Sequence, residues 1–431
     1  MNIKSFVYNL TPLYLRHVYR AHKVYKSISK DLKDTESKFD NALERNRARI
    51  KRGEKIKVAF LHMYATEIQD LNLFDIMLES PYFDPYFIVI PVLFGDQKHM
   101  EFNYNRTVME LTGRYGSNRV LSGYNMENQE CVDYTNQFEL ASTNTPYDRL
   151  TKDYFRSRYW ISKGIPVFYI PYLYMGLSRT TRENLQRIDY NFFWRVFVPN
   201  QYTKTLAKEF MANKGRNIIV TGYTKFDHIS EITTSPHKRK RIIISPHHQV
   251  SDYEWDRGGF RQYADFLQEI PPRYPDVDFI FRPHPQLFET LKKYWSTEEI
   301  DSWLARFTSN ENVTYSTEGD YLKSLADSDA LIHDCDSFVA EYLYFNKPCA
   351  YIYRKGQDQK NIQLKLGLQC LDQHYPIKKD EDWYHFIEDV VLNEKDIRKK
   401  RREAFAKKHI MINYPHATQA VYDAIVKELI R

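Results

Sequence analysis

The sequence has few cysteines and lacks the long apolar stretches that membrane-spanning helices need. Its four cysteines, Cys131, Cys335, Cys349 and Cys370, show no paired spacing, which favours a reduced, cytoplasmic setting over a disulfide framework. No apolar run approaches the roughly 20 residues that cross a bilayer, and no signal peptide is recognisable. These absences favour a protein that is soluble or attached to the surface of a membrane.

Motifs of several common functional classes are also missing. No helix-turn-helix, zinc-finger or RNA-binding signature occurs, so nucleic acid is not an expected partner. His247 and His248 are adjacent, but neighbouring side chains point apart and no Cys, His or Asp spacing completes a known metal site. Ser337 lacks the Gly-x-Ser-x-Gly surroundings of a hydrolase nucleophile. We therefore expect neither a metal nor another cofactor.

Positive charge is concentrated in three segments. The chain carries 62 Lys and Arg against 56 Asp and Glu, a net charge of +6. The excess lies in residues 1–52, where basic side chains are interleaved with Phe, Tyr and Leu, in Lys238–Arg241 and in Arg398–Arg402. Basic helices with aromatic residues attract anionic lipid headgroups, although a solvated charged face explains the same pattern. We predict a basic helical segment at 1–52, with an anionic membrane as a candidate partner.

The remainder of the chain alternates between short apolar runs and helical periodicity. Such alternation is typical of parallel sheets covered by helices, and 431 residues exceed one ordinary core. We predict an α/β, GT-B-like fold of two doubly wound Rossmann-like domains facing a cleft. The predicted division is a first domain at 53–227, a linker at 228–240, a second domain at 241–393 and a helical segment at 394–431. The expected strands are 57–62, 86–91, 138–142, 167–171, 194–199, 217–221, 241–245, 278–281, 313–315, 330–332 and 349–353.

Three predicted strands of the second domain end in polar clusters. These clusters are Ser245–His248, Arg282–Pro285 and His333–Ser337. Strands of one parallel sheet end on the same side, where ligands of such folds bind. We therefore expect the three clusters to converge on one site.

The residue types in these clusters suit a phosphorylated ligand. Asp336 or Ser337 would begin a helix, and a helix start attracts phosphate through its unpaired N–H groups and dipole. Arg282 can pair with a diphosphate through its planar fork. Histidines can donate to phosphate oxygens or move protons, and Glu341, one turn into the helix, could accept from ribose hydroxyls.

In the first domain the candidate catalytic residue is His62. It ends the first expected strand, and Glu67 and Asp70 follow it closely. A histidine at this place can act as the base that activates an acceptor hydroxyl, although packing or capping explains it nearly as well.

The polar clusters resemble the CDP-glycerol glycerophosphotransferase family, which builds teichoic-acid-type and capsular glycerol-phosphate polymers. The matching segments are 281–285, 320–334 and 337–348, with weaker matches at 198–200, 221–227 and 245–248. The resemblance implies that His284 and Arg282 bind the pyrophosphate of a CDP-linked donor. It also implies that Ser337 and the turn around Asp334, with His333 beside it, hold phosphate at the helix start.

The chain departs from this family at two motifs. The His-Gly-Thr-Pro block of the first domain, whose His is a candidate base, corresponds here to residues 167–176, which contain no His. The usual Asp-Tyr-Ser-Ser turn is Asp334-Cys-Asp-Ser337. The sequence therefore resembles a divergent member whose base is His247, His248 or His62.

The resemblance implies transfer of glycerol phosphate, or a related polyol phosphate, from a CDP-linked donor. The acceptor would be a hydroxyl of a cell-surface glycan or a lipid-linked molecule, and the expected location is the cytoplasm, at the inner face of a bacterial membrane. Two alternatives stay open: a GT-B nucleotide-sugar glycosyltransferase, and an inactive scaffold of a polysaccharide assembly complex.

Overall fold

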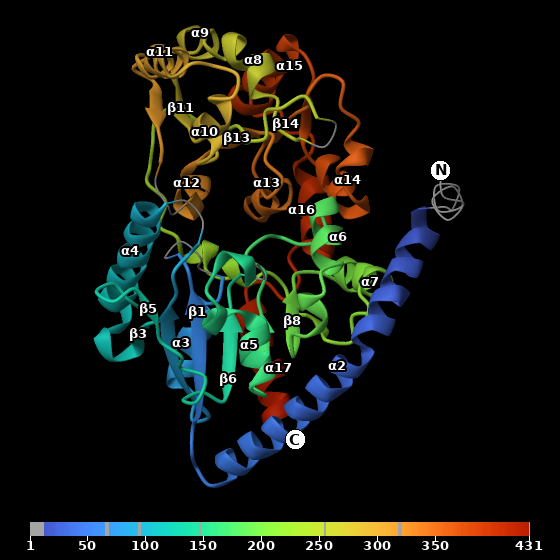
Figure 1. The fold of residues 1–431 in the computed structure, drawn as a ribbon. Coiled ribbons are helices and arrows are strands. Elements are labelled where there is room, and N and C mark those ends of the chain that lie inside the picture. Colours follow the sequence, from blue (N-terminus) through green and yellow to red (C-terminus); the bar gives the residue numbers. More distant parts are fainter. Residues whose placement is uncertain are drawn as a thin grey trace, which may run out of the picture. The chain divides into compact units, whose positions relative to one another are not determined.

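The computed structural model describes residues 13–64, 69–93, 96–145, 148–253, 256–317 and 321–430. The chain forms two compact units, each built around one parallel sheet (Figure 1). Unit 1 comprises Met1–Met175, Thr180–Asp227 and Ile412–Arg431, and unit 2 comprises Gly176–Arg179 and His228–Met411. Two Rossmann-like α/β domains are thus confirmed, whereas the cleft and the domain limits given above stay predictions.

The sheet of unit 1 has seven strands in the order β3-β2-β1-β6-β7-β8-β9. All of its pairs are parallel, and its inner strands are largely buried because helices cover both faces. The strands are β1 (Ile56–His62), β2 (Phe83–Val89), β3 (Val120–Ser122), β6 (Leu140–Thr143), β7 (Val167–Tyr169), β8 (Arg195–Val198) and β9 (Ile218–Val220).

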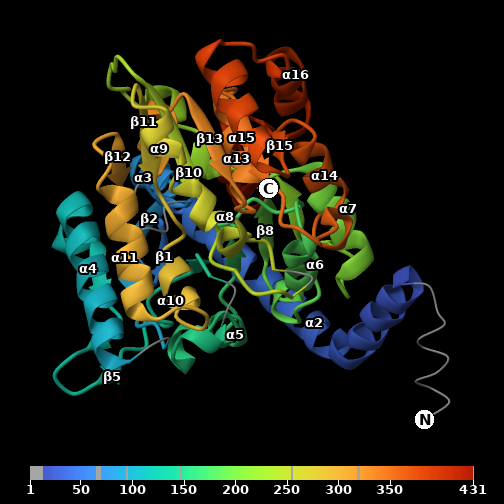
Figure 2. The same cartoon turned by 90° about the horizontal axis from the view of Figure 1, so that it is seen from above.

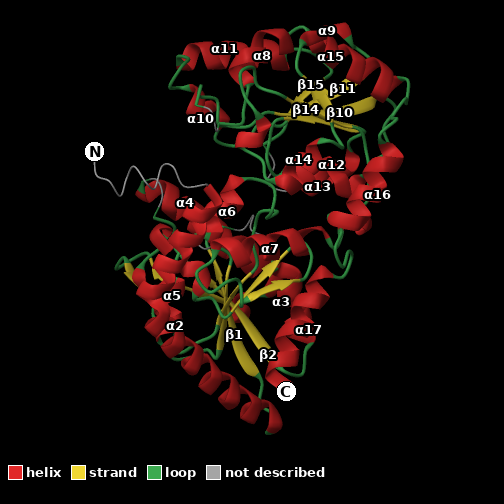
Figure 3. Ribbon diagram, turned by 90° about the vertical axis from the view of Figure 1, so that its right-hand side faces the viewer, coloured by secondary structure: helices red, strands yellow, loops and turns green. Residues whose placement is uncertain are grey.

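Helices lie on both faces of this sheet. Figure 3 shows α2 and α5 on one side and α3 and α17 on the other. The main helices of this part of the chain are α2 (Leu13–Lys51), α3 (Leu71–Glu79), α4 (Gln97–Tyr115), α5 (Ser157–Ser162), α6 (Arg179–Leu185), α7 (Gln201–Phe210) and α17 (Ala417–Ile430).

Helix α2 packs against unit 1 through one apolar stripe. Ile28, Leu32, Phe39 and Leu43 are buried in it, at the four- and seven-residue spacing that places side chains on one helix face. The helix contacts α7 and α17, and Arg47 donates to the carbonyl oxygen of Glu428 at 2.8 Å. The apolar face of α2 between Ile28 and Leu43 is therefore used for packing within the protein.

The sheet of unit 2 has six parallel strands in the order β12-β11-β10-β13-β14-β15. They are β10 (Lys240–Ser245), β11 (Val277–Phe281), β12 (Val313–Tyr315), β13 (Ala330–His333), β14 (Cys349–Ile352) and β15 (Tyr375–Ile377). Figure 3 shows α8, α9, α11 and α15 on one face and α12, α13 and α14 on the other. The helices of this unit are α8 (Phe260–Leu267), α9 (Ile270–Arg273), α10 (Leu287–Leu291), α11 (Thr297–Thr308), α12 (Tyr321–Asp327), α13 (Phe338–Glu341), α14 (Lys365–Leu371), α15 (Asp380–His385) and α16 (Lys399–His409).

Each face of this sheet has its own core. Ile242, Ile244, Phe281 and Ile332 belong to the larger core, with side chains from α8, α11 and α15. Ile243, Leu331, Tyr342 and Cys349 belong to the smaller core on the opposite face. The alternation follows from the two-residue period of a strand. The same period determines on which face of the sheet each side chain at a strand end lies.

Some elements differ from the expectation. The helix after Ser337 is a single turn, α13, followed by a 3-10 turn at Tyr342–Phe345. Asn346 adopts a left-handed conformation with φ 51°, which ends the turn. Helix α3 is described from Leu71, and residues 65–68 lie outside the described part. Within the described ranges, no helix combines the length and apolar character needed to cross a membrane.

Candidate functional site

Three histidines meet at the ends of neighbouring strands β10 and β11 in unit 2. The ring centroids of His247 and His248 are 4.3 Å apart, those of His248 and His284 4.1 Å, and those of His247 and His284 5.4 Å. The backbone N–H of His284 donates to the carbonyl oxygen of Pro246 at 2.9 Å, which ties the two strand-end loops together. The structure therefore brings together two of the three predicted clusters through their side chains. We call His247, His248 and His284 the histidine cluster.

Backbone contacts set the tautomers of two of these rings. Nδ1 of His247 accepts from the N–H of Gln249, and Nδ1 of His284 accepts from the N–H of Gln286, each at 3.2 Å. In a neutral imidazole whose Nδ1 accepts, Nε2 carries the hydrogen. Both rings thus present an N–H donor at Nε2.

The third ring offers a complementary group. Nδ1 of His248 is buried and has no hydrogen-bond partner among the described residues. A buried nitrogen without a partner loses its solvation. The residue as a whole is only partly buried, so a neutral His248 can accept a proton or a hydrogen bond at a ring nitrogen.

The histidine cluster is electrically neutral at neutral pH. Burial, together with the positive charge of Arg257, lowers the pKa of His248 to about 4, and burial next to His248 lowers the pKa of His284 to about 4. Burial, with His248, Arg257 and His284 nearby, holds the pKa of His247 well below its ordinary value. The rings can therefore donate hydrogen bonds to an anion, and an anion would raise these pKa values in turn.

One ring nitrogen from each of the three histidines lies within 4.8 Å of the other two, which is close enough to share a metal ion. A metal needs the lone pair of a nitrogen. If Nε2 of His247 or His284 were the ligand, Nδ1 would carry the hydrogen and the backbone N–H groups of Gln249 and Gln286 would lose their acceptors. The hydrogen bonds of this cluster thus favour an anion over a metal.

Asp334 fixes the loop that carries His247 and His248. Its carboxylate accepts from the backbone N–H of His247 at 2.6 Å, from that of Gly259 at 2.8 Å and from the hydroxyl of Tyr263 at 3.3 Å. The side chain is fully buried, and burial raises its pKa to about 7 although the hydrogen bonds oppose this shift. Asp334 therefore positions the loop that carries His247 and His248. The sequence had predicted that Asp334 contacts phosphate.

Cationic groups flank the cluster. Arg257 is only 8% exposed; it donates to Gln249 Oε1 at 3.0 Å and lies 3.5 Å from the Asp336 carboxylate. Arg282 directly follows β11 and donates from Nη1 to Ser316 Oγ at 2.8 Å. Two guanidinium groups and three imidazoles near one sheet edge form a region that favours a polyanionic ligand.

His333 does not join the histidine cluster. Its side chain is 0% exposed, and its ring packs against Phe338, Tyr351 and His374. The side chains of Leu331 and His333 alternate with that of Ile332 along β13, so His333 lies on the face of the smaller core. The predicted phosphate contact of His333 is corrected here, because a fully buried ring cannot touch a ligand at the surface.

The predicted roles of Ser337 and Glu341 also change. Ser337 precedes α13 but its side chain makes no cap hydrogen bond, and the helix it starts has only one turn. Glu341 is 1% exposed and accepts from the hydroxyl of Tyr321 at 2.8 Å. A carboxylate enclosed in this way is held by the protein, so we no longer predict that Glu341 contacts a ribose.

His62, the candidate base of the first domain, lies inside unit 1. Its side chain is 0% exposed; its Nε2 lies 3.0 Å from Asp70 Oδ1 and its ring packs edge-on against Phe87. A His–Asp pair can serve a general base, but an acceptor hydroxyl cannot reach a fully buried ring. Glu67 lies outside the described residues.

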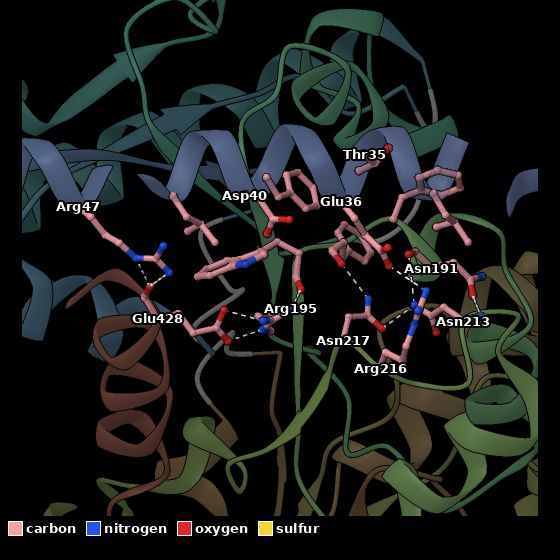
Figure 4. A pocket seen from close by; sticks show the side chains of 16 residues that line it. Thr35, Glu36, Asp40, Arg47, Asn191, Arg195, Asn213, Arg216, Asn217 and Glu428 are labelled. Carbon is pink, nitrogen blue, oxygen red and sulfur yellow. Dashed lines mark hydrogen bonds and ion pairs between the residues drawn. The ribbon is translucent and has the colours of Figure 1, made fainter. Parts of the chain in front are cut away.

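A pocket of about 280 Å³ lies within unit 1 beside α2 (Figure 4). Its three arginines are engaged by the chain itself: Arg195 pairs with Glu428 at 2.5 Å, Arg216 pairs with Glu36 at 2.8 Å, and Arg47 donates to the Glu428 carbonyl oxygen. The pocket is a polar part of the packing interface along α2, and we do not assign a phosphorylated ligand to it.

Comparisons with known proteins were made on both sequence and fold. No protein-family model matches the sequence, and no curated protein sequence matches it. Solved structures do match its fold. The UDP-GlcNAc 2-epimerase from Neisseria meningitidis, bound to UDP-GlcNAc, is 15% identical, with a TM-score of 0.54 over 86% of this chain and 100% of that chain.

Two further structures give the same result. A variant of the wall teichoic acid polymerase TagF is 13% identical, with a TM-score of 0.53 over 100% of this chain and 98% of that chain. The UDP-GlcNAc 2-epimerase from Methanocaldococcus jannaschii, in complex with UDP-GlcNAc and UDP, is 13% identical, with a TM-score of 0.53 over 86% of this chain and 100% of that chain. These likenesses show the fold: the chain has a GT-B-like architecture of two Rossmann-like domains.

Proposed function

We propose that this protein transfers glycerol phosphate, or a related polyol phosphate, from a CDP-linked donor to a hydroxyl group. The observation that carries the proposal is the neutral histidine cluster at the ends of β10 and β11, with two Nε2–H donors fixed by backbone contacts. The resemblance of segments 281–285, 320–334 and 337–348 to glycerophosphotransferases supports the same donor. The acceptor in this proposal is a cell-surface glycan or a lipid-linked molecule.

In the proposed reaction, the donor's diphosphate lies against the histidine cluster. His247 and His284 donate from Nε2 to its oxygens, and Arg282 neutralises part of its charge. The acceptor oxygen attacks the phosphorus that bears the glycerol, a new P–O bond forms, and the P–O bond to CMP breaks. Preorganised donors stabilise the charge that develops on CMP, which is usually the largest contribution to such a step.

The proton of the acceptor hydroxyl needs a base. His248 is the best candidate in unit 2, because it is neutral and, unlike His62, only partly buried. General-base help of this kind contributes about 10²–10⁴ in rate.

A second candidate is a nucleotide-sugar enzyme of the same architecture. It is favoured by the fold neighbours that were solved with UDP-GlcNAc or UDP. Sugar transfer breaks a bond to carbon and releases a nucleoside diphosphate, whereas glycerol-phosphate transfer releases CMP. The released nucleotide therefore separates the two functions, and an inactive scaffold would release neither.

The test combines binding with product analysis. Purified protein is screened by thermal shift with CDP-glycerol, CDP-ribitol, CDP, CMP, UDP and UDP-GlcNAc, and CMP release is followed with glycan acceptors. We expect cytidine nucleotides to stabilise the protein, by about 2.7 kcal/mol at a hundredfold excess over Kd. His284→Ala and Arg282→Ala should each weaken binding about 10- to 150-fold, the effect of losing one hydrogen bond to a charged group.

The matched control is His385→Gln, which changes an exposed histidine of the same unit that pairs with Asp389. It should bind and react like the unchanged protein. Stabilisation by uridine nucleotides alone would support the second candidate. Unchanged CMP release in His284→Ala and Arg282→Ala would refute the proposed donor site.

We further propose that the basic face of α2 binds the surface of an anionic membrane, and that the protein is a peripheral membrane protein of the cytoplasm. The apolar stripe of this helix is occupied by packing, so the attraction would be electrostatic and sensitive to salt. Co-sedimentation with vesicles that contain phosphatidylglycerol tests this. Equal binding to neutral vesicles, or no binding at low salt, would refute it.

A further inference from the structure

A second group of metal-ligating side chains lies in unit 2, on the face of the smaller core. His333 ends β13, Cys349 begins β14, and His374 comes immediately before β15, in the turn after α14. Figure 2 shows β13, β15 and α14 of this unit from above. These three strands are neighbours in the sheet: Leu331 pairs with Cys349 and Ala350 with Tyr375. One ligand atom from each of the three residues lies within 4.8 Å of the other two. Their side chains are 0%, 0% and 1% exposed.

The two imidazoles are oriented as metal ligands are. Nδ1 of His374 lies 2.8 Å from the carbonyl oxygen of Cys370, and Nδ1 of His333 lies 3.0 Å from that of Cys335. A ring that donates from Nδ1 to a carbonyl keeps a lone pair at Nε2, and metal-binding histidines are commonly held in this way. The N–H of Cys335 also lies 3.2 Å from Nδ1 of His333 and loses its acceptor in this tautomer.

The opposite nitrogens of both rings make no hydrogen bond of standard geometry with the described residues. Nε2 of His333 and Nε2 of His374 are buried and lack hydrogen-bond partners among the described residues. Leaving a buried polar atom unpaired costs about 1–3 kcal/mol, and here two such atoms occur beside a buried thiol. A cation that accepts all three lone pairs would satisfy them together.

We propose that His333, Cys349 and His374 bind a zinc ion. Zinc prefers nitrogen and sulfur ligands, with Zn–N bonds of about 2.0–2.1 Å and Zn–S bonds of about 2.3 Å in tetrahedral geometry. Such bonds place the ligand atoms about 3.3–3.6 Å apart, so the side chains close in slightly around the ion. Tyr351 packs against His333, and its buried hydroxyl lacks a partner among the described residues, which makes it the candidate for the fourth position.

Zinc binding would deprotonate the thiol. Burial raises the pKa of Cys349 well above its ordinary value, and a metal reverses this because the thiolate is the ligand. The ion would join β13, β14 and the start of β15 at one point, next to Asp334, which holds the loop of the histidine cluster. The site is therefore structural, and it is independent of the function proposed above.

The full-length protein, purified without a histidine tag, tests the assignment by elemental analysis. We expect about one zinc ion per chain, which dialysis against EDTA under native conditions removes slowly because the ligands are buried. Cys349→Ser and His374→Ala should each lose the ion. Cys370→Ser, a change at another fully buried cysteine of the same unit, should keep it.

A second measurement does not depend on how well the variants fold. The wild-type protein, produced in cobalt-supplemented medium, should show the charge-transfer absorption of a thiolate–cobalt bond and the visible bands of tetrahedral cobalt. Wild-type protein that contains no zinc and does not take it up during refolding would overturn the proposal. So would a zinc content in folded Cys349→Ser equal to that of the wild type.

Discussion

Replacing Asp334 by Asn tests whether one buried carboxylate holds the loop of the histidine cluster. Three donors converge on this carboxylate: the backbone N–H groups of His247 and Gly259 and the hydroxyl of Tyr263. The side-chain amide of Asn keeps one oxygen but turns the other acceptor into a donor. At least one backbone N–H is then buried without an acceptor and faces an NH₂ group.

The magnitude follows from the number of groups left unpaired. Each buried donor without an acceptor costs about 1–3 kcal/mol. The two N–H groups lie at 2.6 and 2.8 Å from separate carboxylate oxygens, so the amide can serve only one of them. We expect the loop from Pro246 to Gly259 to open more easily by about 1–3 kcal/mol, which corresponds to an increase of about 5- to 150-fold in hydrogen exchange.

Hydrogen–deuterium exchange with mass spectrometry measures this opening directly. Peptides that cover residues 246–260 should exchange faster in Asp334→Asn, whereas peptides from unit 1 should not change. The matched control is Asp278→Asn, which removes a partly exposed carboxylate paired with Arg239 and should change stability by less than about 1 kcal/mol. Equal exchange of residues 246–260 in wild type and Asp334→Asn would refute the positioning role.

Two further predictions concern the same loop and cluster. His248 and His284 have a pKa of about 4, below the ordinary 6.5, so the unfolded chain binds protons between pH 6.5 and 4 that the folded chain does not. The free energy of unfolding should therefore fall as the pH drops through this window, by at most about 2 kcal/mol per histidine at pH 5 before solvent screening. Denaturant titrations of the His248→Gln/His284→Gln variant should show a smaller fall. A fall equal to that of the wild type would contradict the lowered pKa values of these two histidines. In Gly258→Ala the new Cβ would lie 2.8 Å from the Gln249 carbonyl oxygen and 2.9 Å from that of His247, which should destabilise the loop by about 1–3 kcal/mol. Gly113→Ala in α4, where a Cβ meets no atom within 4 Å, should gain about 0.5–1 kcal/mol, and thermal melting of both variants decides whether crowding is the cause.

The parallel strands were predictable because a strand that is buried on both faces is a continuous apolar run. The runs at 57–62 and 241–245 became β1 (Ile56–His62) and β10 (Lys240–Ser245). Two elements gave weak signals. Helix α4 buries only Tyr104, Thr107 and Leu111, so it lacks a clear apolar stripe. Strand β15 contains Pro376, which argues against a central strand but is tolerated at the edge of the sheet, where β15 lies.

The sequence was enough to predict that polar residues converge at the strand ends. To predict on which face of the sheet each side chain lies, the two-residue period of a strand is also needed. His333 directly follows Ile332, whose side chain enters the larger core, so the alternation alone places His333 on the opposite face. His374 belongs to no motif and is separated from Cys349 by a helix and two turns. Only the pairing of β14 with β15 brings it beside Cys349, and a single sequence does not display that register.

The chemical difference between the two histidine groups arises from backbone atoms. At His247 and His284, the ring Nδ1 accepts from an amide, so the outward nitrogen donates and suits an oxyanion. At His374, Nδ1 faces a carbonyl oxygen, so the other nitrogen keeps its lone pair and suits a cation. His333 has both an amide and a carbonyl near Nδ1, and the nearby thiol of Cys349 favours the second arrangement. Residue type alone therefore predicts that a histidine can bind, but the peptide group next to its ring decides the sign of the charge it binds.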